Sequence, residues 1–201
     1  MIQYKKYYMP GTKEELLKTI DTIDCTYDIL AGGTDLYAKE KTPFNGADAA
    51  IDISGIKEFS VIKLKKEEGL ITFGSNICIQ QFLEEKVLME NVPILRHAAI
   101  YFADQQIREM ATVGGNVANS SPSGDTIAPL TALEAVIHTI TSKDNKICEK
   151  ETPITEFITG VGKNLLEKGE VISSITCPVL KEYGCASVSY THLRAHETEL
   201  H

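Results

Sequence analysis

Two glycine-bearing segments hold most of the residues that could do chemistry. The first is Ala31-Gly32-Gly33-Thr34-Asp35-Leu36, and the second covers residues 111–125 with the sequence ATVGGNVANSSPSGD. Glycine tolerates positive φ and lets a ligand approach the backbone, and exposed N–H groups in such turns form a nest that suits a phosphate. The second segment has so little bulk that we do not expect it to form core. Two such segments, about eighty residues apart, predict one long ligand held at two points, as a pyrophosphate-containing dinucleotide would be.

Together the two segments resemble those of the flavin-binding subunit of the molybdenum hydroxylases, the group of xanthine, carbon monoxide and nicotinate dehydrogenases. Residues 98–110 (AAIYFADQQIREM) are similar to the helix and Gln-Ile-Arg turn that precede the second segment in this family, and residues 153–157 with Gly169-Glu170 resemble its later sequence. The resemblance runs from about Tyr4 to Leu180. It implies an α+β, two-lobed FAD-binding fold of the PCMH/vanillyl-alcohol-oxidase-like type, with a small N-terminal α/β lobe and a larger mixed-sheet lobe with helices.

The resemblance also implies which residues bind the cofactor. Both segments and one aromatic residue before the second contribute to this candidate set: Ala31, Gly32, Gly33, Thr34, Asp35, Leu36, Phe102, Thr112, Gly114, Gly115, Asn116, Ser121 and Asp125. Backbone N–H donors and a helix N-terminus are expected to hold the pyrophosphate. Asp125 corresponds to a carboxylate that reaches a hydroxyl of the flavin's sugar or ribityl chain, while a plain helix cap stays open for it. Phe102 fits core equally well.

Neither histidine nor cysteine occurs inside the two segments, so the expected FAD is non-covalent. His97 and His138 are interpreted as core or surface residues. No acid–base pair, nucleophilic triad or metal cluster stands out, so we predict no catalytic and no metal-binding residues. The family implies an electron-relay subunit: iron–sulfur clusters of one partner chain pass electrons to this FAD, a molybdenum–pterin partner oxidises the substrate, and NAD or another acceptor takes the electrons. The molybdenum subunit chooses the substrate.

Two other functions remain open at this stage. One is a nucleotide- or phosphate-binding module without a redox role, which the same glycine-bearing segments would serve. The other is a flavoenzyme of the cell-wall sugar-reductase type, which would need its own substrate acid; no motif for one is apparent. A flavin-binding chain would be yellow, whereas a plain phosphate binder would be colourless.

Composition narrows the class of protein. The 201 residues carry a formal net charge of −8. This charge argues against a nucleic-acid-binding protein, because binding to the phosphate backbone needs a basic surface. No apolar run approaches the roughly 18 residues of a membrane span, and the N-terminus lacks the apolar core of a secretory signal. Five scattered cysteines without C-x-x-C spacing fit reduced thiols in the cytoplasm better than a metal site.

The pattern along the chain predicts short elements. Thr12 should cap a helix, with Glu15 as its capping-box partner. Strands are expected over residues 27–30, 49–53 and 171–179, and hairpins over 61–73 and 136–150. Helices are expected over 79–89, over most of 93–110, and over 126–135, the last capped by Asp125. This gives an N-terminal lobe over residues 1–56, with a loop through Pro43, Asn45 and Gly46, and a second lobe over 57–180.

The last residues do not resemble the family. Residues 188–198 are similar to the translated reading frame of a transposase adapter used in preparing sequencing libraries. We therefore expect residues 188–201 to be a non-native tail, and residues 181–187 to be the start of a missing C-terminal domain.

Overall fold

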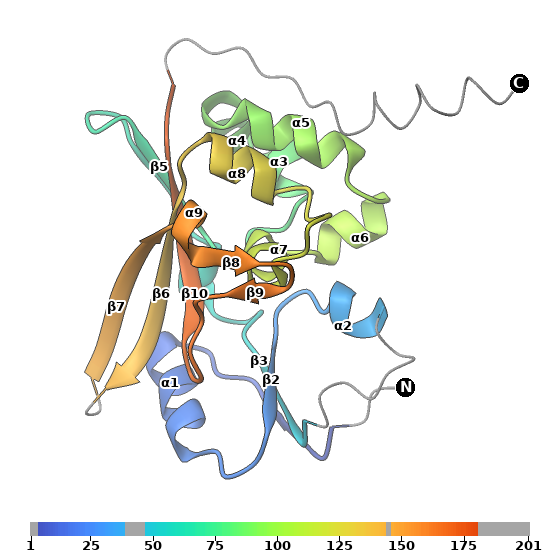
Figure 1. Ribbon diagram of the computed structural model, residues 1–201, viewed down its shortest axis with the longest axis vertical. Helices are drawn as coiled ribbons and strands as arrows, with labels where there is room; N and C mark the ends of the chain where they lie inside the picture. Colours follow the sequence, from blue (N-terminus) through green and yellow to red (C-terminus); the bar gives the residue numbers. More distant parts are fainter. Residues whose placement is uncertain (1–3, 39–46, 144–145, 181–201) are drawn as a thin grey trace, which may run out of the picture.

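The described residues form a three-stranded sheet, a five-stranded sheet, a small two-stranded hairpin and several short helices (Figure 1). The fold is described from a computed structural model, in which residues 4–38, 47–143 and 146–180 are placed. The predicted loop through Pro43, Asn45 and Gly46, the start of a further domain at 181–187 and the tail at 188–201 lie outside these described residues.

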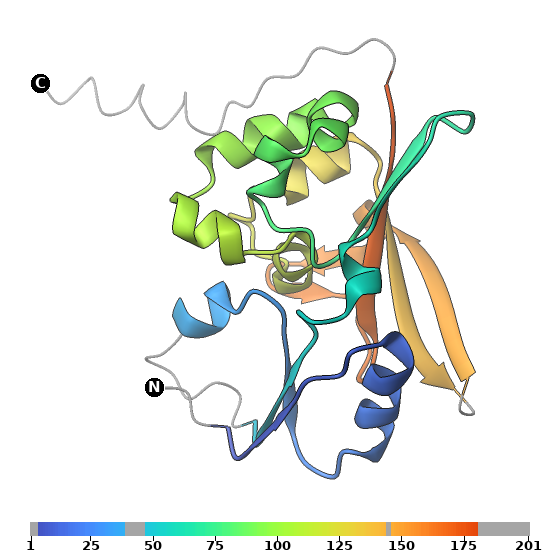
Figure 2. The ribbon, with the colours of Figure 1, turned by 180° about the vertical axis from the view of Figure 1, so that it is seen from behind.

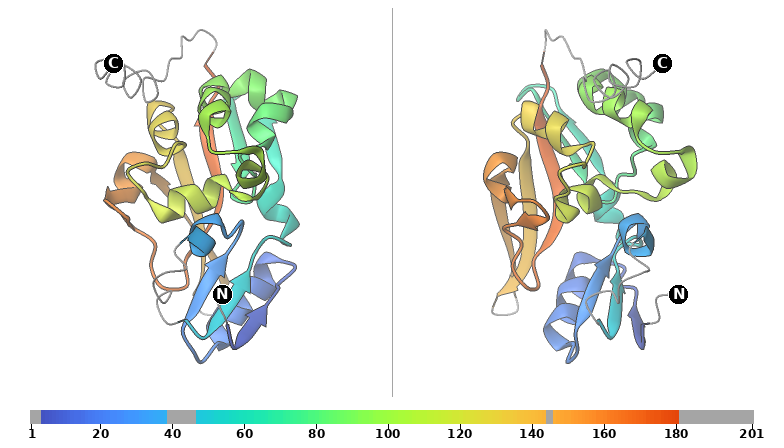
Figure 3. Two further views of the ribbon diagram at one scale, coloured as in Figure 1. Left: turned by 90° about the vertical axis from the view of Figure 1, so that its right-hand side faces the viewer. Right: turned by 45° about the vertical axis from the view of Figure 1, so that its right-hand side comes forward.

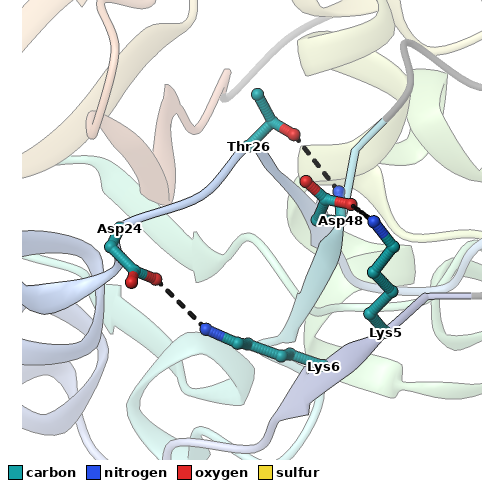
Figure 4. A network of polar contacts seen from close by, with 5 residues as sticks. All are labelled: Lys5, Lys6, Asp24, Thr26 and Asp48. Carbon is teal, nitrogen blue, oxygen red and sulfur yellow. Dashed lines mark hydrogen bonds and ion pairs between the residues drawn. The ribbon is translucent and has the colours of Figure 1, made fainter.

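The first sheet has three parallel strands in the order β1-β3-β2, formed by Lys6–Tyr8, Ala49–Asp52 and Tyr27–Leu30. Exposed ion pairs lie beside the amino ends of these strands, where Lys5 contacts Asp48 at 2.6 Å and Lys6 contacts Asp24 at 3.1 Å (Figure 4). Exposed pairs of this kind contribute little stability. In open parallel sheets, ligands bind beyond the carboxyl ends of the strands. A ligand site is thus expected at the end of this sheet opposite the ion pairs.

Helix α1 (Lys13–Thr22) begins as predicted. The Thr12 hydroxyl accepts a hydrogen bond from the Glu15 backbone N–H, and the Glu15 carboxylate accepts one from Gly11 N–H, one residue before the usual capping-box donor. Leu16 and Leu17 are buried against the first sheet and against Ile140 and Val171 of the second. Helix α1 thus packs the two sheets together.

The second sheet has five strands in the order β4-β5-β10-β6-β7, formed by Ile62–Lys65, Leu70–Gly74, Val171–Pro178, Val136–Lys143 and Lys146–Pro153. All four pairings are antiparallel, so the prediction of a mixed sheet is wrong: the parallel pairings occur in the small sheet instead. Both predicted hairpins are confirmed. The last strand lies at the centre of the sheet, with a register shift between Ile172 and Ser174.

Short helices lie on one side of the five-stranded sheet (Figures 2 and 3). They are α3 (Gln81–Glu84), α4 (Lys86–Asn91), α5 (Pro93–Tyr101), α6 (Gln105–Met110), α7 (Val113–Asn119) and α8 (Ile127–Ala132). Their apolar side chains form one core with the sheet, in which Phe73 and Phe82 meet edge-to-face with 5.4 Å between ring centroids. The remaining described elements are helix α2 (Thr34–Ala38), a 3-10 turn at Lys57–Ser60, helix α9 (Ile154–Phe157) and the hairpin of β8 (Ile158–Gly160) and β9 (Lys163–Asn164).

Two predicted helices are each broken once. Glu85 is extended (ψ 110°) and separates α3 from α4, which allows Phe82 and Leu88 both to be buried. A turn at residues 102–104 separates α5 from α6, because Asp104 caps α6 by accepting from Ile107 N–H at 2.8 Å. None of the described helices is both long and apolar enough to cross a bilayer.

Candidate functional site

The first glycine-bearing segment follows strand β2 at the carboxyl edge of the small sheet and leads into helix α2 (Thr34–Ala38). Gly33 has φ +71°, a backbone conformation that suits glycine. Gly32 is needed for another reason: a Cβ atom there would lie 1.7 Å from the carbonyl oxygen of Met110, at the end of α6. Gly32 therefore allows the first segment to touch the chain just before the second one.

The second segment differs from the prediction of an open loop. Residues 113–119 form helix α7, and Val113, Gly114 and Val117 are buried, so the expectation that this segment makes no core is wrong. The reason is close packing: the N–H groups of Val113 and Gly114 donate to the carbonyls of Ile77 and Ser75, each at 2.9 Å. A Cβ at Gly114 would meet the Ser75 Cβ at 2.5 Å.

Thr112 caps helix α7. Its hydroxyl accepts from Gly115 N–H at 3.1 Å, and its carbonyl accepts from Asn116 N–H at 3.0 Å. The first-turn N–H groups of α7 thus all have partners within the protein. In contrast, the first N–H groups of α2 have no partner within that helix, as at any helix start. The first turn of α7 therefore has no unpaired N–H group to offer an anion.

The end of the second segment is a turn stabilised by its own side chains. The Asn116 Oδ1 accepts from the Thr126 hydroxyl at 2.6 Å, and the hydroxyls of Ser121 and Ser123 lie 3.0 Å apart. Helix α8 begins at Ile127 and has no side-chain cap, so the prediction that Asp125 caps it is wrong. Thr126, whose hydroxyl is bound by Asn116, is the N-cap residue of α8. Asp125, just before it, is exposed and stands on the rim of the pocket.

The two segments face each other across one pocket of about 590 Å³. This volume lies within the range of small-molecule and cofactor sites. Its wall includes every residue of the candidate set: Ala31, Gly32, Gly33, Thr34, Asp35, Leu36, Phe102, Thr112, Gly114, Gly115, Asn116, Ser121 and Asp125. Phe102 is 8% exposed and belongs to the core, so its core interpretation is confirmed, whereas its contact with a cofactor stays a prediction. His97 and His138 do not line this pocket.

Sequence reasoning missed much of the pocket wall. The missed polar residues come from strand β2, from the turn after β5 and from the start of β10; among them are Asp28, Ser75, Asn76 and Glu170. Glu170 accepts from the Thr139 hydroxyl and from Glu167 N–H. The Gly169-Glu170 pair was the only sequence signal for any of these, because the others are brought to the site by pairing between distant strands.

The pocket wall is acidic. Among the described residues it contains four carboxylates, Asp28, Asp35, Asp125 and Glu170, and no lysine, arginine or histidine. Burial raises the pKa of Asp28, and the hydrogen bond from the Tyr4 hydroxyl opposes this shift. Burial also raises the pKa of Asp125. An anionic ligand would therefore depend on backbone N–H groups and hydroxyls.

Two buried polar atoms of the pocket-lining residues have no hydrogen-bond partner within the described structure: the Ser75 hydroxyl and the Asn76 Oδ1. Such atoms are costly to bury unpaired, so they mark places where a ligand or water completes the site. The glycine-bearing wall leaves room for a large molecule lying between the two segments.

Comparison with known proteins identifies the family. Residues 2–180 match the model described as the FAD binding domain in molybdopterin dehydrogenase. The chain belongs to this family of FAD-binding domains. It is 29% identical over 174 residues to the nicotinate dehydrogenase FAD-subunit of Eubacterium barkeri, and 31% identical over 150 residues to the xanthine dehydrogenase FAD-binding subunit of Escherichia coli O157:H7. These alignments cover 85% and 75% of this chain, and 57% and 50% of the relatives.

Solved structures agree with this FAD-binding family. The carbon monoxide dehydrogenase of Hydrogenophaga pseudoflava superposes with a TM-score of 0.81 at 26% identity, covering 90% of this chain and 61% of that one. The α+β fold expected from the sequence is confirmed by this likeness. The chain spans about half to three-fifths of the length of these relatives.

Proposed function

We propose that this chain binds FAD non-covalently in the pocket between its two sheets and serves as the electron-relay part of a molybdenum-dependent dehydrogenase. The observation that carries the proposal is the convergence of the two glycine-bearing segments on one pocket. The family match supports FAD as the ligand. We also propose that the small parallel sheet and the antiparallel sheet correspond to the two lobes of a PCMH-type fold, dividing near residue 56.

Each part of the pocket has a distinct role in this proposal. The N–H groups of Gly32, Gly33 and the start of α2 would donate to the pyrophosphate. Gly115 lines the pocket, and a Cβ there would lie 2.9 Å from the Thr112 hydroxyl, so a side chain would disturb the cap of α7 as well as the pocket wall. Asp125 on the rim would accept a hydrogen bond from a hydroxyl of the cofactor. FAD, when bound, would supply a centre that exchanges one or two electrons, and the protein would supply binding and orientation.

The proposal includes partner chains. Three relatives are named as the FAD-subunit or the medium chain of a dehydrogenase. We propose that a molybdenum–pterin chain and an iron–sulfur chain join this one, and that NAD or another acceptor takes the electrons. A cytoplasmic setting agrees with the free thiols of Cys25, Cys78, Cys148 and Cys177.

The colour of the purified protein tests cofactor binding. We expect a yellow protein that releases FAD on denaturation, and colourless Gly33→Val and Gly115→Val proteins. Gly55→Val is the matched control, because a Cβ at Gly55 meets no atom within 4 Å and the residue lies outside the pocket. Full flavin absorbance in both pocket variants would contradict the two-segment site. A colourless wild-type chain that still binds ADP would favour the phosphate-binding module without a redox role.

A further inference from the structure

We infer that Arg108 is a positioning residue for the proposed FAD site, which holds the Phe102–Ala103 turn in the conformation that closes one side of the pocket. This inference rests on the proposed function but concerns a residue outside the pocket. Arg108 does not line the pocket, whereas Phe102, Ala103 and Ile107, which precede it in the chain, do.

The first observation is the strain of this turn. Ala103 has φ +34°, one of only three positive-φ residues other than glycine in the described chain. Such a backbone conformation persists only where its surroundings impose it, and it often occurs at functional sites. Phe102, directly before it, is nearly buried and belongs both to the core and to the pocket wall.

The second observation is the set of hydrogen bonds that impose the turn. One nitrogen of the Arg108 guanidinium, Nη1, donates to the carbonyl oxygens of Phe102 and of Ala103, each at 3.0 Å. Another, Nε, donates to Gln80 Oε1 at 2.9 Å. The planar guanidinium has its donors in a fixed arrangement, so it fixes the position of two consecutive carbonyls relative to Gln80.

Gln80 is itself held in place. Its Nε2 donates to Glu84 Oε1 at 2.7 Å, which orients the amide so that Oε1 faces Arg108. Its backbone N–H donates to the Arg108 carbonyl at 3.1 Å, and the neighbouring Ile79 N–H donates to the Ala111 carbonyl at 2.9 Å. Helix α6 is thereby tied to the chain before α3 on one side and, through Met110 against Gly32, to the first glycine-bearing segment on the other.

The consequence is that Arg108 links three parts of the proposed site. From its place on α6, Arg108 fixes the turn that carries Phe102 and Ala103, and its bond to Gln80 ties α6 to the chain before α3. Helix α6 ends where the two glycine-bearing segments meet. Loss of its donors would free a strained turn to relax, so that the pocket wall would no longer have one shape. The effect on FAD would pass through geometry, without a direct contact.

The test combines FAD affinity with hydrogen exchange in the purified chain. Arg108→Met should weaken FAD binding about tenfold or more, since hydrogen bonds to a charged group are lost. The same variant should speed amide exchange at residues 102–104 in the cofactor-free protein. Arg108→Lys should recover part of both effects, because an ammonium group can donate to the two carbonyls but cannot also reproduce the fixed donor to Gln80. Arg96→Met, at an exposed arginine on α5, is the matched control and should behave as wild type.

Wild-type affinity and exchange in a folded Arg108→Met protein would overturn the inference. If that variant does not fold, Gln80→Met decides instead: weaker FAD binding with faster exchange at 102–104 supports the inference, and wild-type behaviour overturns it. A wild-type chain that binds no FAD would overturn the proposed function, whereas the exchange measurement would still report whether Arg108 fixes the turn.

Discussion

Glycine at position 32 is required by the backbone that lies beside it. The space for a Cβ is already taken by the Met110 carbonyl, which belongs to the backbone and cannot rotate away. We expect Gly32→Ala to lower the free energy of unfolding by about 1–3 kcal/mol, the usual range for overpacking, and to weaken FAD binding. Urea unfolding would measure the loss. Gly55→Ala, with open space around its Cβ, should stay within about 0.5 kcal/mol of wild type.

Asp28 is a half-buried carboxylate in the pocket wall, and burial raises its pKa. A carboxyl whose pKa is raised by folding binds its proton more tightly in the native state, so it lowers stability once the pH rises above the unfolded pKa. We therefore expect Asp28→Asn to raise the Tm of the cofactor-free protein slightly near neutral pH. The gain should shrink as the pH falls through the raised native pKa, and it should be gone below the ordinary carboxyl pKa of about 3.9. Thermal melts between about pH 3 and about pH 8 would show this pH dependence, and a gain in Tm that stays constant with pH would contradict it.

At the scale of single elements, helix α7 shows how the second segment is built. The Thr112 hydroxyl is the acceptor for Gly115 N–H, so Thr112→Val should cost about 1 kcal/mol of stability and leave this N–H unpaired at the pocket. Thr112→Ser keeps the acceptor and should lose much less. Denaturant unfolding of both variants measures the difference, and equal losses would show that the cap contributes nothing.

The strands and the first helix could be predicted because their signals are local. A short apolar run that ends at a glycine pair located β2, and Thr12 with Glu15 located the start of α1. Both glycine-bearing segments were also found, since glycine-rich polar runs are rare in a core. The candidate residues chosen from them all line the pocket, although contact with FAD stays a prediction.

Other features depend on contacts that the sequence does not display. The second segment was expected to form an open turn outside the core, because its glycines tolerate positive φ and its side chains have little bulk. It is a helix because Gly114 fits against Ser75, a contact between distant parts of the chain. For the same reason the contributions of Asp28, Ser75 and Glu170 to the pocket appear only when the strands that carry them are paired.

At the scale of the whole molecule, the pocket lies between two sheets that α1 holds together, and the chain covers about half to three-fifths of its relatives' length. We expect the native protein to occur in a complex with a molybdenum–pterin chain and an iron–sulfur chain. A tagged chain purified from its own cells should therefore carry two further polypeptides, with molybdenum and iron in the same fractions. Recovery of the protein only as a lone monomer, from cells that also express the proposed partner chains, would contradict this expectation.

The most direct test of the central claim is an equilibrium titration of FAD into the cofactor-free wild-type chain. The two-segment pocket predicts saturable binding of one FAD per chain, and the same titration of Gly115→Val should show no saturable binding while Gly55→Val matches wild type. Wild-type protein that shows no saturation at about 1 mM FAD, or Gly115→Val protein that binds FAD as tightly as wild type, would contradict the account.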